Sequence, residues 1–310
     1  MKRGIVLSLL FSLGAISIAA ASFQNPPAGQ RRGEGRGQQA QQPQQPLEIQ
    51  KVKDNLYMII GNGGNTAAFI TEGGVVVVDT KNPGNGQAIL DKIKSVTSKP
   101  VTMIINTHTH ADHVGSNEAF SPTVDIVTQE NTKANMEKME NFKGDKAKFL
   151  PKKTFKDKLT LGKGKDEINL YYFGRAHTNG DAWVVFPAVR ALHSGDAFAN
   201  KGTPIIDTNN GGSAVEYGKT LAKAASTIKN IDVIITGHSN TTMTPADLKE
   251  YADFNNDFTT WVQGEIRAGK TVDEASMEYK IPDKYKGYTI NTFFGGIKGN
   301  IQTAYNELKK

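Results

Sequence analysis

Three of the chain's six histidines lie within six residues of one another, directly after a segment that indicates a buried strand. Residues 101–105 (Val-Thr-Met-Ile-Ile) are apolar and mostly β-branched, which is typical of a strand inside a sheet. On the extended segment that follows, His108 and His110 are two residues apart, so their side chains project to the same side. Asp112 and His113 fall in the turn before a short helical segment. The fold must therefore let one buried strand deliver four metal-binding side chains to one place.

Imidazole nitrogens and carboxylate oxygens are ligands that Zn²⁺ accepts at about 2.0–2.2 Å. Four such groups in six residues exceed the needs of one tetrahedral ion, once ligands from elsewhere in the chain are added. The spacing therefore predicts two metal ions. The alternative is a polar loop that holds histidines by chance, and the concentration of three of the six histidines here disfavours it.

Three further polar side chains, His177, Asp196 and His238, follow predicted strands and lie close to glycines. Rigid strands that open into loops can deliver ligands to one edge of a scaffold in this way. A single histidine of this kind is more often a surface or core residue, but here three separate strand ends repeat the pattern. We therefore predict that these three residues complete the metal site.

Three other polar residues near strand ends are predicted to have supporting roles. His193 lies inside or at the end of its strand and outside the ligand pattern, which indicates a structural histidine. Asp181 is predicted to cap the turn after His177, in preference to orienting that ring. Asp79 ends a continuous apolar run, and the sequence leaves open whether it caps a turn or orients a ligand.

The N-terminal segment has the pattern of a secretory signal peptide over residues 1–21. A basic Lys2-Arg3 pair precedes an apolar run, and small residues at 19–21 form a cleavage site. An uncleaved membrane anchor is the alternative, but the serine and glycine interruptions favour cleavage. We expect a periplasmic or secreted protein without a stable membrane anchor.

Residues 22–46 are rich in Gln, Pro and Gly, and are predicted to be a disordered linker before a single folded domain over 47–310. The chain's net charge of +6 is concentrated at the N-terminus. Residues 1–46 hold five basic side chains and one acidic one, a net charge of +4, which leaves +2 for the domain. We therefore expect no nucleic acid partner. The chain has no cysteine, which excludes disulfides and thiolate ligands.

Strands and helices are predicted in two successive blocks, which is typical of two sheets with helices outside. No internal repeat of fixed period is present. The predicted strands are 55–60, 66–71, 75–79, 101–105, 124–128, 168–173, 182–186, 189–193 and 231–236, and the predicted helices are 87–95, 131–141, 214–229, 247–268 and 298–308.

The order and spacing of these motifs over residues 52–240 resemble the metallo-β-lactamase superfamily. The resemblance rests on the run from His108 to His113, then His177 in a His-Thr-x-Gly-Asp context, Asp196 in Ser-Gly-Asp and His238 in Gly-His. It implies an α+β fold, the αβ/βα sandwich, with two mixed β-sheets packed face to face and helices on the outer faces. It also implies two Zn²⁺ per chain: the first is held by His108, His110 and His177, the second by Asp112, His113 and His238, and Asp196 bridges both.

The residue at position 196 separates branches of this superfamily. The drug-hydrolysing members carry Cys or Ser there, whereas a bridging Asp is similar to the branch of glyoxalase II-type thioesterases and lactonases. The resemblance thus implies a secreted dinuclear zinc hydrolase that uses a metal-bridging hydroxide on a small-molecule ester, thioester, lactone or amide carbonyl. Asp112 is the expected catalytic residue, which passes a proton to the leaving group.

Three alternatives stay open. Export is shared with β-lactamases and favours action on β-lactam antibiotics. A mononuclear iron enzyme resembling persulfide dioxygenases would use His108, His177 and Asp196 as a two-histidine, one-carboxylate set. A metal-dependent binding module without catalysis is the third alternative. The sequence predicts no oligomeric state.

Two basic features are predicted to be solvated. The segment 143–165 holds nine lysines and two aspartates, which favours a solvated loop over a patch that attracts anionic substrates. Lys201 is likewise predicted to be solvated, in preference to binding a substrate carboxylate. The walls of the active site are expected to come from the loops 61–65, 141–166 and 199–213.

Overall fold

The computed structural model describes Met1 and residues 46–309. Apart from Met1 and Pro46, the predicted signal peptide (1–21) and linker (22–46) lie outside the described residues and stay predictions. No helix in the described part of the chain combines the length and the apolar character needed to cross a membrane.

The first sheet has seven strands in the order β1-β2-β3-β4-β5-β6-β7. Strands β1 to β4 pair antiparallel, and β4 to β7 pair parallel, so the sheet is mixed. Its strands are β1 Glu48–Lys53, β2 Leu56–Ile60, β3 Thr66–Ile70, β4 Val75–Val78, β5 Val101–Ile105, β6 Asp125–Gln129 and β7 Lys153–Phe155.

The second sheet has five strands in the order β12-β11-β10-β9-β8. Its strands pair antiparallel except for β11 and β12, which are parallel. Strands β9, β11 and β12 therefore run in one direction and end at the same edge. The strands are β8 Lys158–Leu161, β9 Ile168–Tyr171, β10 Trp183–Phe186, β11 Ala191–His193 and β12 Val233–Ile235.

Seven α-helices are described, and the longest begins with strong local signals. Helix α5 starts at Pro245 behind a capping box, in which Thr244 and Asp247 satisfy each other's backbone N–H groups. The helices are α1 Gly86–Lys94, α2 Ala111–Val114, α3 Glu130–Met136, α4 Ala214–Thr227, α5 Pro245–Arg267, α6 Val272–Glu278 and α7 Gly296–Leu308.

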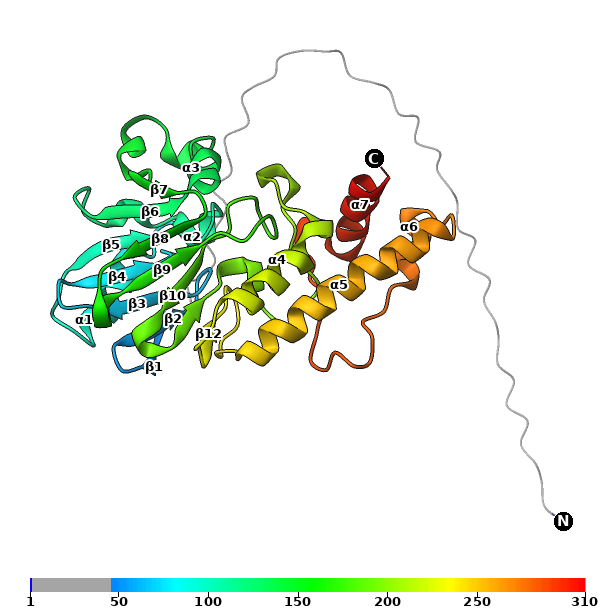
Figure 1. Ribbon diagram of the computed structural model, residues 1–310, viewed down its shortest axis with the longest axis horizontal. Helices are drawn as coiled ribbons and strands as arrows, with labels where there is room; N and C mark the ends of the chain where they lie inside the picture. The colour runs from blue at the N-terminus through cyan, green and yellow to red at the C-terminus, as the bar shows by residue number, and fades with distance from the viewer. Residues whose placement is uncertain (2–45, 310) are drawn as a thin grey trace. The chain divides into compact units, whose positions relative to one another are not determined.

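The two sheets pack face to face, with helices on both outer faces (Figure 1). Strand β4 shows the layering, because its alternate side chains enter different cores. Val76 and Val78 join the core between the sheets, whereas Val75 and Val77 pack in the outer core that contains Ile89 of α1. On the other side, α4 and α5 lie side by side and share a core with the outer face of the second sheet (Figure 1). The predicted αβ/βα sandwich is confirmed.

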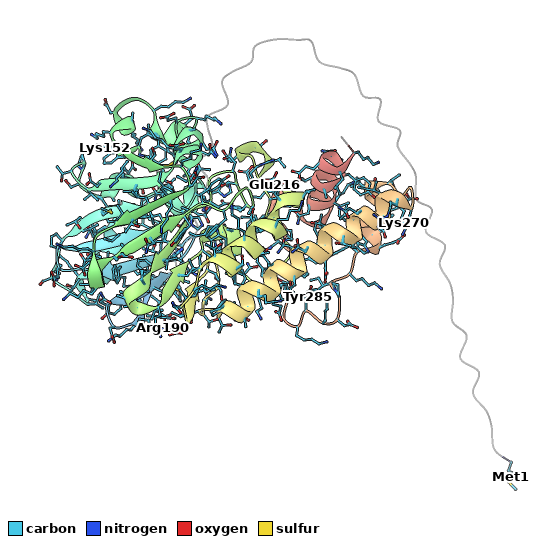
Figure 2. All side chains as sticks on the ribbon, viewed as in Figure 1. Met1, Lys152, Arg190, Glu216, Lys270 and Tyr285 are labelled. Atoms are coloured by element: carbon cyan, nitrogen blue, oxygen red, sulfur yellow. The ribbon has the colours of Figure 1, made fainter. Side chains whose placement is uncertain are left out.

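The lysine-rich segment 143–165 was predicted as a loop but contains strands β7 and β8. Each of these strands forms the edge of its sheet. Charged side chains on an edge strand oppose pairing with another molecule, and they also hide the apolar alternation that identifies a strand. Lys152, just before β7, is exposed and lies on the outside of the sheet layers (Figure 2).

Several other element boundaries differ from the prediction. The helix predicted over 131–141 ends at Met136, and a separate 3₁₀ turn follows at Glu140–Phe142. The sequence patterns also missed strand β1 and helix α6, which are short or only half-buried and therefore carry weak periodicity.

Candidate metal centre

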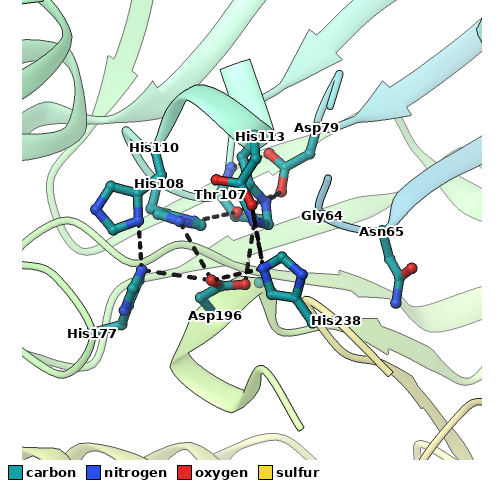
Figure 3. A network of polar contacts seen from close by, with 12 residues as sticks. Gly64, Asn65, Asp79, Thr107, His108, His110, His113, His177, Asp196 and His238 are labelled. Carbon is teal, nitrogen blue, oxygen red and sulfur yellow. Dashed lines mark hydrogen bonds and ion pairs between the residues drawn. The ribbon is translucent and has the colours of Figure 1, made fainter. Parts of the chain in front are cut away.

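The seven predicted ligand residues come from the segments that follow β5, β9, β11 and β12, and the structure brings all seven together (Figure 3, in which all but Asp112 are labelled). One group joins His108, His110, His177 and Asp196, whose ligand atoms lie within 4.8 Å of one another. A second group is formed in the same way by Asp112, His113 and His238.

In the first group, the nitrogens of three rings face a common point. His177 Nε2 lies 2.8 Å from His110 Nδ1. Asp196 Oδ2 lies 3.7 Å from His177 Nε2 and 3.9 Å from His108 Nε2. These distances leave room for one ion among three nitrogens and a carboxylate oxygen, which matches the tetrahedral demand of zinc.

In the second group, two rings and a carboxylate converge. His238 Nε2 lies 3.4 Å from Asp112 Oδ2 and 3.5 Å from His113 Nε2. Asp112 and His113 share the single-turn helix α2, and His238 follows strand β12. The side chain of Asp112 is 30% exposed, so this group opens towards solvent.

The carboxylate of Asp196 lies between the two groups (Figure 3). Its Oδ1 is 3.2 Å from His113 Nε2, and its Oδ2 is 3.2 Å from His238 Nε2. The close approach of the next loop depends on Gly237, because a Cβ there would lie 1.8 Å from Asp196 Oδ1. One carboxylate therefore contacts both sets of nitrogens.

Asp79 orients the ring of His113 in the second group. It accepts hydrogen bonds from His113 Nδ1 at 2.7 Å, from Thr107 N at 2.8 Å and from Thr107 Oγ1 at 2.6 Å. The bond to His113 places the proton on Nδ1 and leaves Nε2 free to face Asp196. Of the two roles left open by the sequence, orientation of a ligand is the one the structure supports.

The outer nitrogens of the first group are held in the same manner. His110 Nε2 lies 2.7 Å from Asp207 Oδ2, and His177 Nδ1 lies 2.7 Å from the carbonyl oxygen of Ile205. Because each ring donates outward, its other nitrogen carries the lone pair that points into the cluster.

The electrostatics favour neutral imidazoles at His108 and His177. Burial lowers the pKa of His108 well below its usual value, and the charge of His113 adds to this. Burial and the neighbouring His110 lower the pKa of His177 to about 4. Burial would also lower the pKa of His113, but the carboxylates of Asp196 and Asp79 outweigh it and raise that pKa well above its usual value. Without a metal, a protonated His113 compensates the charge of Asp196.

One buried atom gives a direct test of whether a cation fits. His108 Nε2 is fully buried and has no hydrogen-bond partner among the described residues. A buried polar atom left unpaired costs about 1–3 kcal/mol. This nitrogen points at Asp196, where a cation would accept its lone pair. The donor set of nitrogens and oxygens fits zinc.

The centre opens into a cavity of about 350 Å³. Of the three loops expected to form its walls, 199–213 contributes Ile205, whereas 61–65 and 141–166 contribute none of the lining residues. That expectation was wrong for those two loops: Gly64 in the first of them packs against His113 without lining the cavity, and the second contains the edge strands β7 and β8. The walls are completed by Phe293 and Phe294 near the C-terminus, which the sequence analysis missed.

The supporting residues have defined contacts. His193 Nε2 lies 3.0 Å from the carbonyl oxygen of Asn65, and Gly195 N donates to His193 Nδ1 at 3.1 Å, so both ring nitrogens are engaged away from the centre. Asp181 accepts hydrogen bonds from the backbone and hydroxyl of Thr178, which is the predicted turn cap.

Two further residues were misjudged or missed. Lys201 was predicted to be solvated, but its side chain is only 26% exposed and forms ion pairs with Asp247 at 2.6 Å and Glu250 at 3.2 Å. It does not line the cavity. Asp207 was missed as the partner of His110. Its sequence signal is an Asx turn, in which Asp207 accepts from the backbone of Asn209, and this signal does not reveal the distant histidine.

Residues 60–251, more than half of the chain, match the family model of the metallo-beta-lactamase superfamily. A metallo-beta-lactamase type 2 from Elizabethkingia meningoseptica is 26% identical over 203 residues, which cover 63% of this chain and 79% of that protein. The alpha subunit of a 2,4-dinitroanisole O-demethylase from Nocardioides sp. (strain JS1661) is 28% identical over 154 residues, which cover 48% of this chain and 46% of that protein.

Solved structures share the fold at low identity. A metallo-beta-lactamase from Pontibacter korlensis has a TM-score of 0.58 at 21% identity, and the match covers 67% of this chain and 98% of that one. A stereoselective inverting sec-alkylsulfatase from Pseudomonas sp. has a TM-score of 0.70 at 15% identity, and the match covers 84% of this chain and 50% of that one. Together with the family match, the shared fold shows that the chain belongs to the metallo-beta-lactamase superfamily, whose members are mostly metal-dependent hydrolases.

Proposed function

We propose that this chain is a dinuclear zinc hydrolase that cleaves an ester, thioester, lactone or amide bond of a small molecule. The observation that carries the proposal is the position of Asp196, whose two oxygens each lie 3.2 Å from a different histidine of the second group. The same carboxylate also contacts two histidines of the first group. A carboxylate shared by two ligand sets is suited to hold two cations close together.

Seven side chains of this chain would hold the metals. His108, His110 and His177 would bind the first zinc ion, and Asp112, His113 and His238 the second, with Asp196 shared. When bound, zinc supplies a Lewis acid that polarises a carbonyl and lowers the pKa of water towards about 7. No thiolate competes for the ions, because the chain has no cysteine.

Asp112 is the residue we propose to move the proton. Its carboxylate is 30% exposed and belongs to the lining of the cavity, so it can contact both a bound water and a substrate. We expect it to accept a proton from the attacking water and to return that proton to the leaving group. Asp79 and Asp207 act on the reaction only by fixing the rings of His113 and His110.

β-Lactam hydrolysis is the second candidate. It is supported by the relative from Elizabethkingia meningoseptica, which is a metallo-beta-lactamase aligned over 79% of its length. An amine leaving group from a β-lactam must be held and protonated, whereas an alkoxide or thiolate needs less help. A pair of cations held through Asp196 would therefore favour esters, thioesters and lactones over β-lactams.

The test has two parts, metal content and turnover. Elemental analysis of the purified chain is expected to give about two zinc ions, and one iron per chain would replace the proposal with the dioxygenase alternative. The zinc-loaded enzyme should then be assayed on an aryl ester, an acyl-homoserine lactone, a glutathione thioester, a secondary alkyl sulfate and a carbapenem. A carbapenem preferred by tenfold or more would favour the β-lactamase candidate. Two zinc ions without turnover of any of these substrates would favour a binding module.

We also propose that the protein is exported, on the basis of the signal-peptide pattern in residues 1–21. Mature protein is expected to begin at or near Ser22. N-terminal sequencing of the protein recovered from the periplasm or the medium tests this, and an intact Met1 would contradict it.

A further inference from the structure

We infer that Phe293 and Phe294 form an aromatic platform at the mouth of the metal cavity, and that the platform binds a planar, uncharged group of the substrate. The inference rests on the proposed hydrolase function and narrows its substrate class. It concerns residues beyond the part of the chain that matches the family model, which ends at residue 251.

The platform lies directly against the first ligand group. The ring of Phe294 stacks on the ring of His110, with centroids 5.5 Å apart and planes at 24°. It also meets the ring of His177 at 6.4 Å in an edge-on arrangement. Both phenylalanines line the same cavity as Asp196 and His238. A substrate group on the platform would therefore lie beside the bond that the centre cleaves.

The two rings are exposed although they are large and apolar. Phe293 is 61% exposed and Phe294 is 47% exposed, and Ile290, three residues before Phe293 in the sequence, is 46% exposed. Neighbouring apolar side chains left uncovered around a pocket are typical of a binding site, because solvent contact is unfavourable for them until a ligand covers them.

The backbone holds Phe294 in a conformation that few residues adopt. Its φ of 50° and ψ of 40° lie in the left-handed region, which is unfavourable for a bulky side chain. The segment before it is fixed, because Asn291 N donates to Thr203 Oγ1 at 2.9 Å and Thr203 N donates to the carbonyl of Thr289 at 2.9 Å. Strain that the surrounding contacts maintain at a pocket is typical of a functional position.

Helix α7 packs against the backbone of Phe294 at one glycine, Gly299. A Cβ at Gly299 would lie 2.2 Å from the carbonyl oxygen of Phe294, so only glycine allows this close contact. Gly299 is not among the residues that line the cavity. It offers a way to move the platform without changing either ring.

The charges around the cavity define the class of substrate. Every ionisable residue that lines it belongs to the metal centre, and the rest of its described lining is Asn82, Ala111, Ile205 and the two phenylalanines. No lysine or arginine is among these lining residues to pair with a distant carboxylate or phosphate. The walls thus match an aromatic or similar planar apolar group, and they hold no cationic side chain for an anionic tail.

The test compares two neutral esters with the same leaving group, ethyl phenylacetate and ethyl acetate, on zinc-loaded full-length enzyme. The wild type is expected to prefer ethyl phenylacetate. Phe294→Ala should lower kcat/KM for this ester by about five- to tenfold, mainly through KM, because one aromatic contact is lost. The same variant should change kcat/KM for ethyl acetate less than twofold. Phe294→Leu distinguishes loss of the aromatic ring from loss of apolar bulk, because leucine keeps the bulk and removes the ring. If ring stacking binds the substrate, Phe294→Leu should show the same selective loss as Phe294→Ala.

Matched controls guard against indirect effects. Gly299→Ala is expected to reproduce the selective loss, whereas Gly264→Ala in α5, where a Cβ meets nothing within 4 Å, should not. Met277→Ala removes an exposed apolar side chain that does not line the cavity, and it should leave kcat/KM for both esters unchanged. Zinc content must stay the same in all variants, because Phe294 touches His110.

A binding measurement keeps this inference separate from the proposed function. If neither ester is cleaved while two zinc ions are bound, the hydrolase proposal fails. Calorimetry with phenylacetate and acetate then still tests the platform. Tighter binding of phenylacetate that is lost in Phe294→Ala supports it. Equal loss for both ligands, no loss in the variant, or dissociation of an oligomer on substitution of Phe294 would overturn it, the last by showing that a second copy covers the rings.

Discussion

The Nε2 atom of His110 lies 2.7 Å from the Oδ2 atom of Asp207, although 97 residues separate them in the chain. Burial would raise the pKa of Asp207, but the hydrogen bond from His110 and one from Asn210 lower it to about 2. The carboxylate is therefore ionised at neutral pH and holds the proton of His110 on Nε2. This leaves Nδ1 as the nitrogen that faces His177, at 2.8 Å.

The first prediction follows from this contact. Asp207→Ala should weaken the binding of one zinc ion by about 10- to 100-fold, because the ring of His110 loses its orientation and basicity. Competition with a chromophoric chelator measures the change. Asp232→Ala is the control, since Asp232 is exposed and pairs with Arg190. Equal zinc affinity in Asp207→Ala and the wild type would contradict the orienting role.

The second prediction uses the packing of a glycine against the second group. A Cβ at Gly64 would lie 2.1 Å from Cε1 of His113, so Gly64→Ala must displace that ring or the loop. We expect the loss of about one zinc equivalent and of most activity. Gly73→Ala is the matched control, because a Cβ there meets nothing within 4 Å. Full zinc content in Gly64→Ala would show that the loop containing Gly64 moves and that the ring of His113 does not.

The sequence could predict which residues gather at the centre, because buried strands determine where the chain emerges. His108 follows β5 and His238 follows β12, both of which are short apolar strands with obvious patterns. The partners that orient the rings could not be predicted in the same way. Asp207 and Phe294 lie on turns whose direction depends on backbone angles, and no periodicity encodes these angles.

Charge patterns misled the prediction where they coincide with structure. The run of lysines over 143–165 indicated a solvated loop, yet it includes two edge strands, whose exposed faces tolerate lysine. A run of lysines therefore indicates that a segment is exposed to solvent, but it does not distinguish a strand from a loop. The same limit applies to Lys201, whose partners Asp247 and Glu250 come from a helix distant in sequence.

The third prediction concerns the one histidine assigned a structural role. His193→Gln should leave two zinc ions bound and lower the free energy of unfolding by no more than about 1–2 kcal/mol, because it loses hydrogen bonds to Asn65 and Gly195 only. Elemental analysis and urea denaturation give the two quantities. Loss of a zinc equivalent would mean that the ligand set has been assigned wrongly.

The last prediction concerns Lys81, a fully buried lysine that contacts the loop containing Gly64. Its Nζ donates to the carbonyl oxygens of Ile59 at 2.9 Å and Gly64 at 2.8 Å. Burial lowers its pKa from 10.5 to about 7, and the charges of Asp79 and Asp112 only partly oppose this. Between these two values the unfolded chain binds a proton that the folded chain has released.

Stability linked to Lys81 should therefore rise with pH across this window, by up to about 1.4 kcal/mol per pH unit, and should be constant below about pH 7, where both states are protonated. Lys81→Met removes the titrating group, so the difference in unfolding free energy between wild type and variant should shift in favour of the wild type from pH 7 to pH 9. Taking the difference cancels the other groups that titrate in both proteins. Urea denaturation in the presence of a chelator measures it, with Lys51→Met, at an exposed position, as the control. A difference that does not change with pH would mean that Lys81 keeps its proton in the folded state.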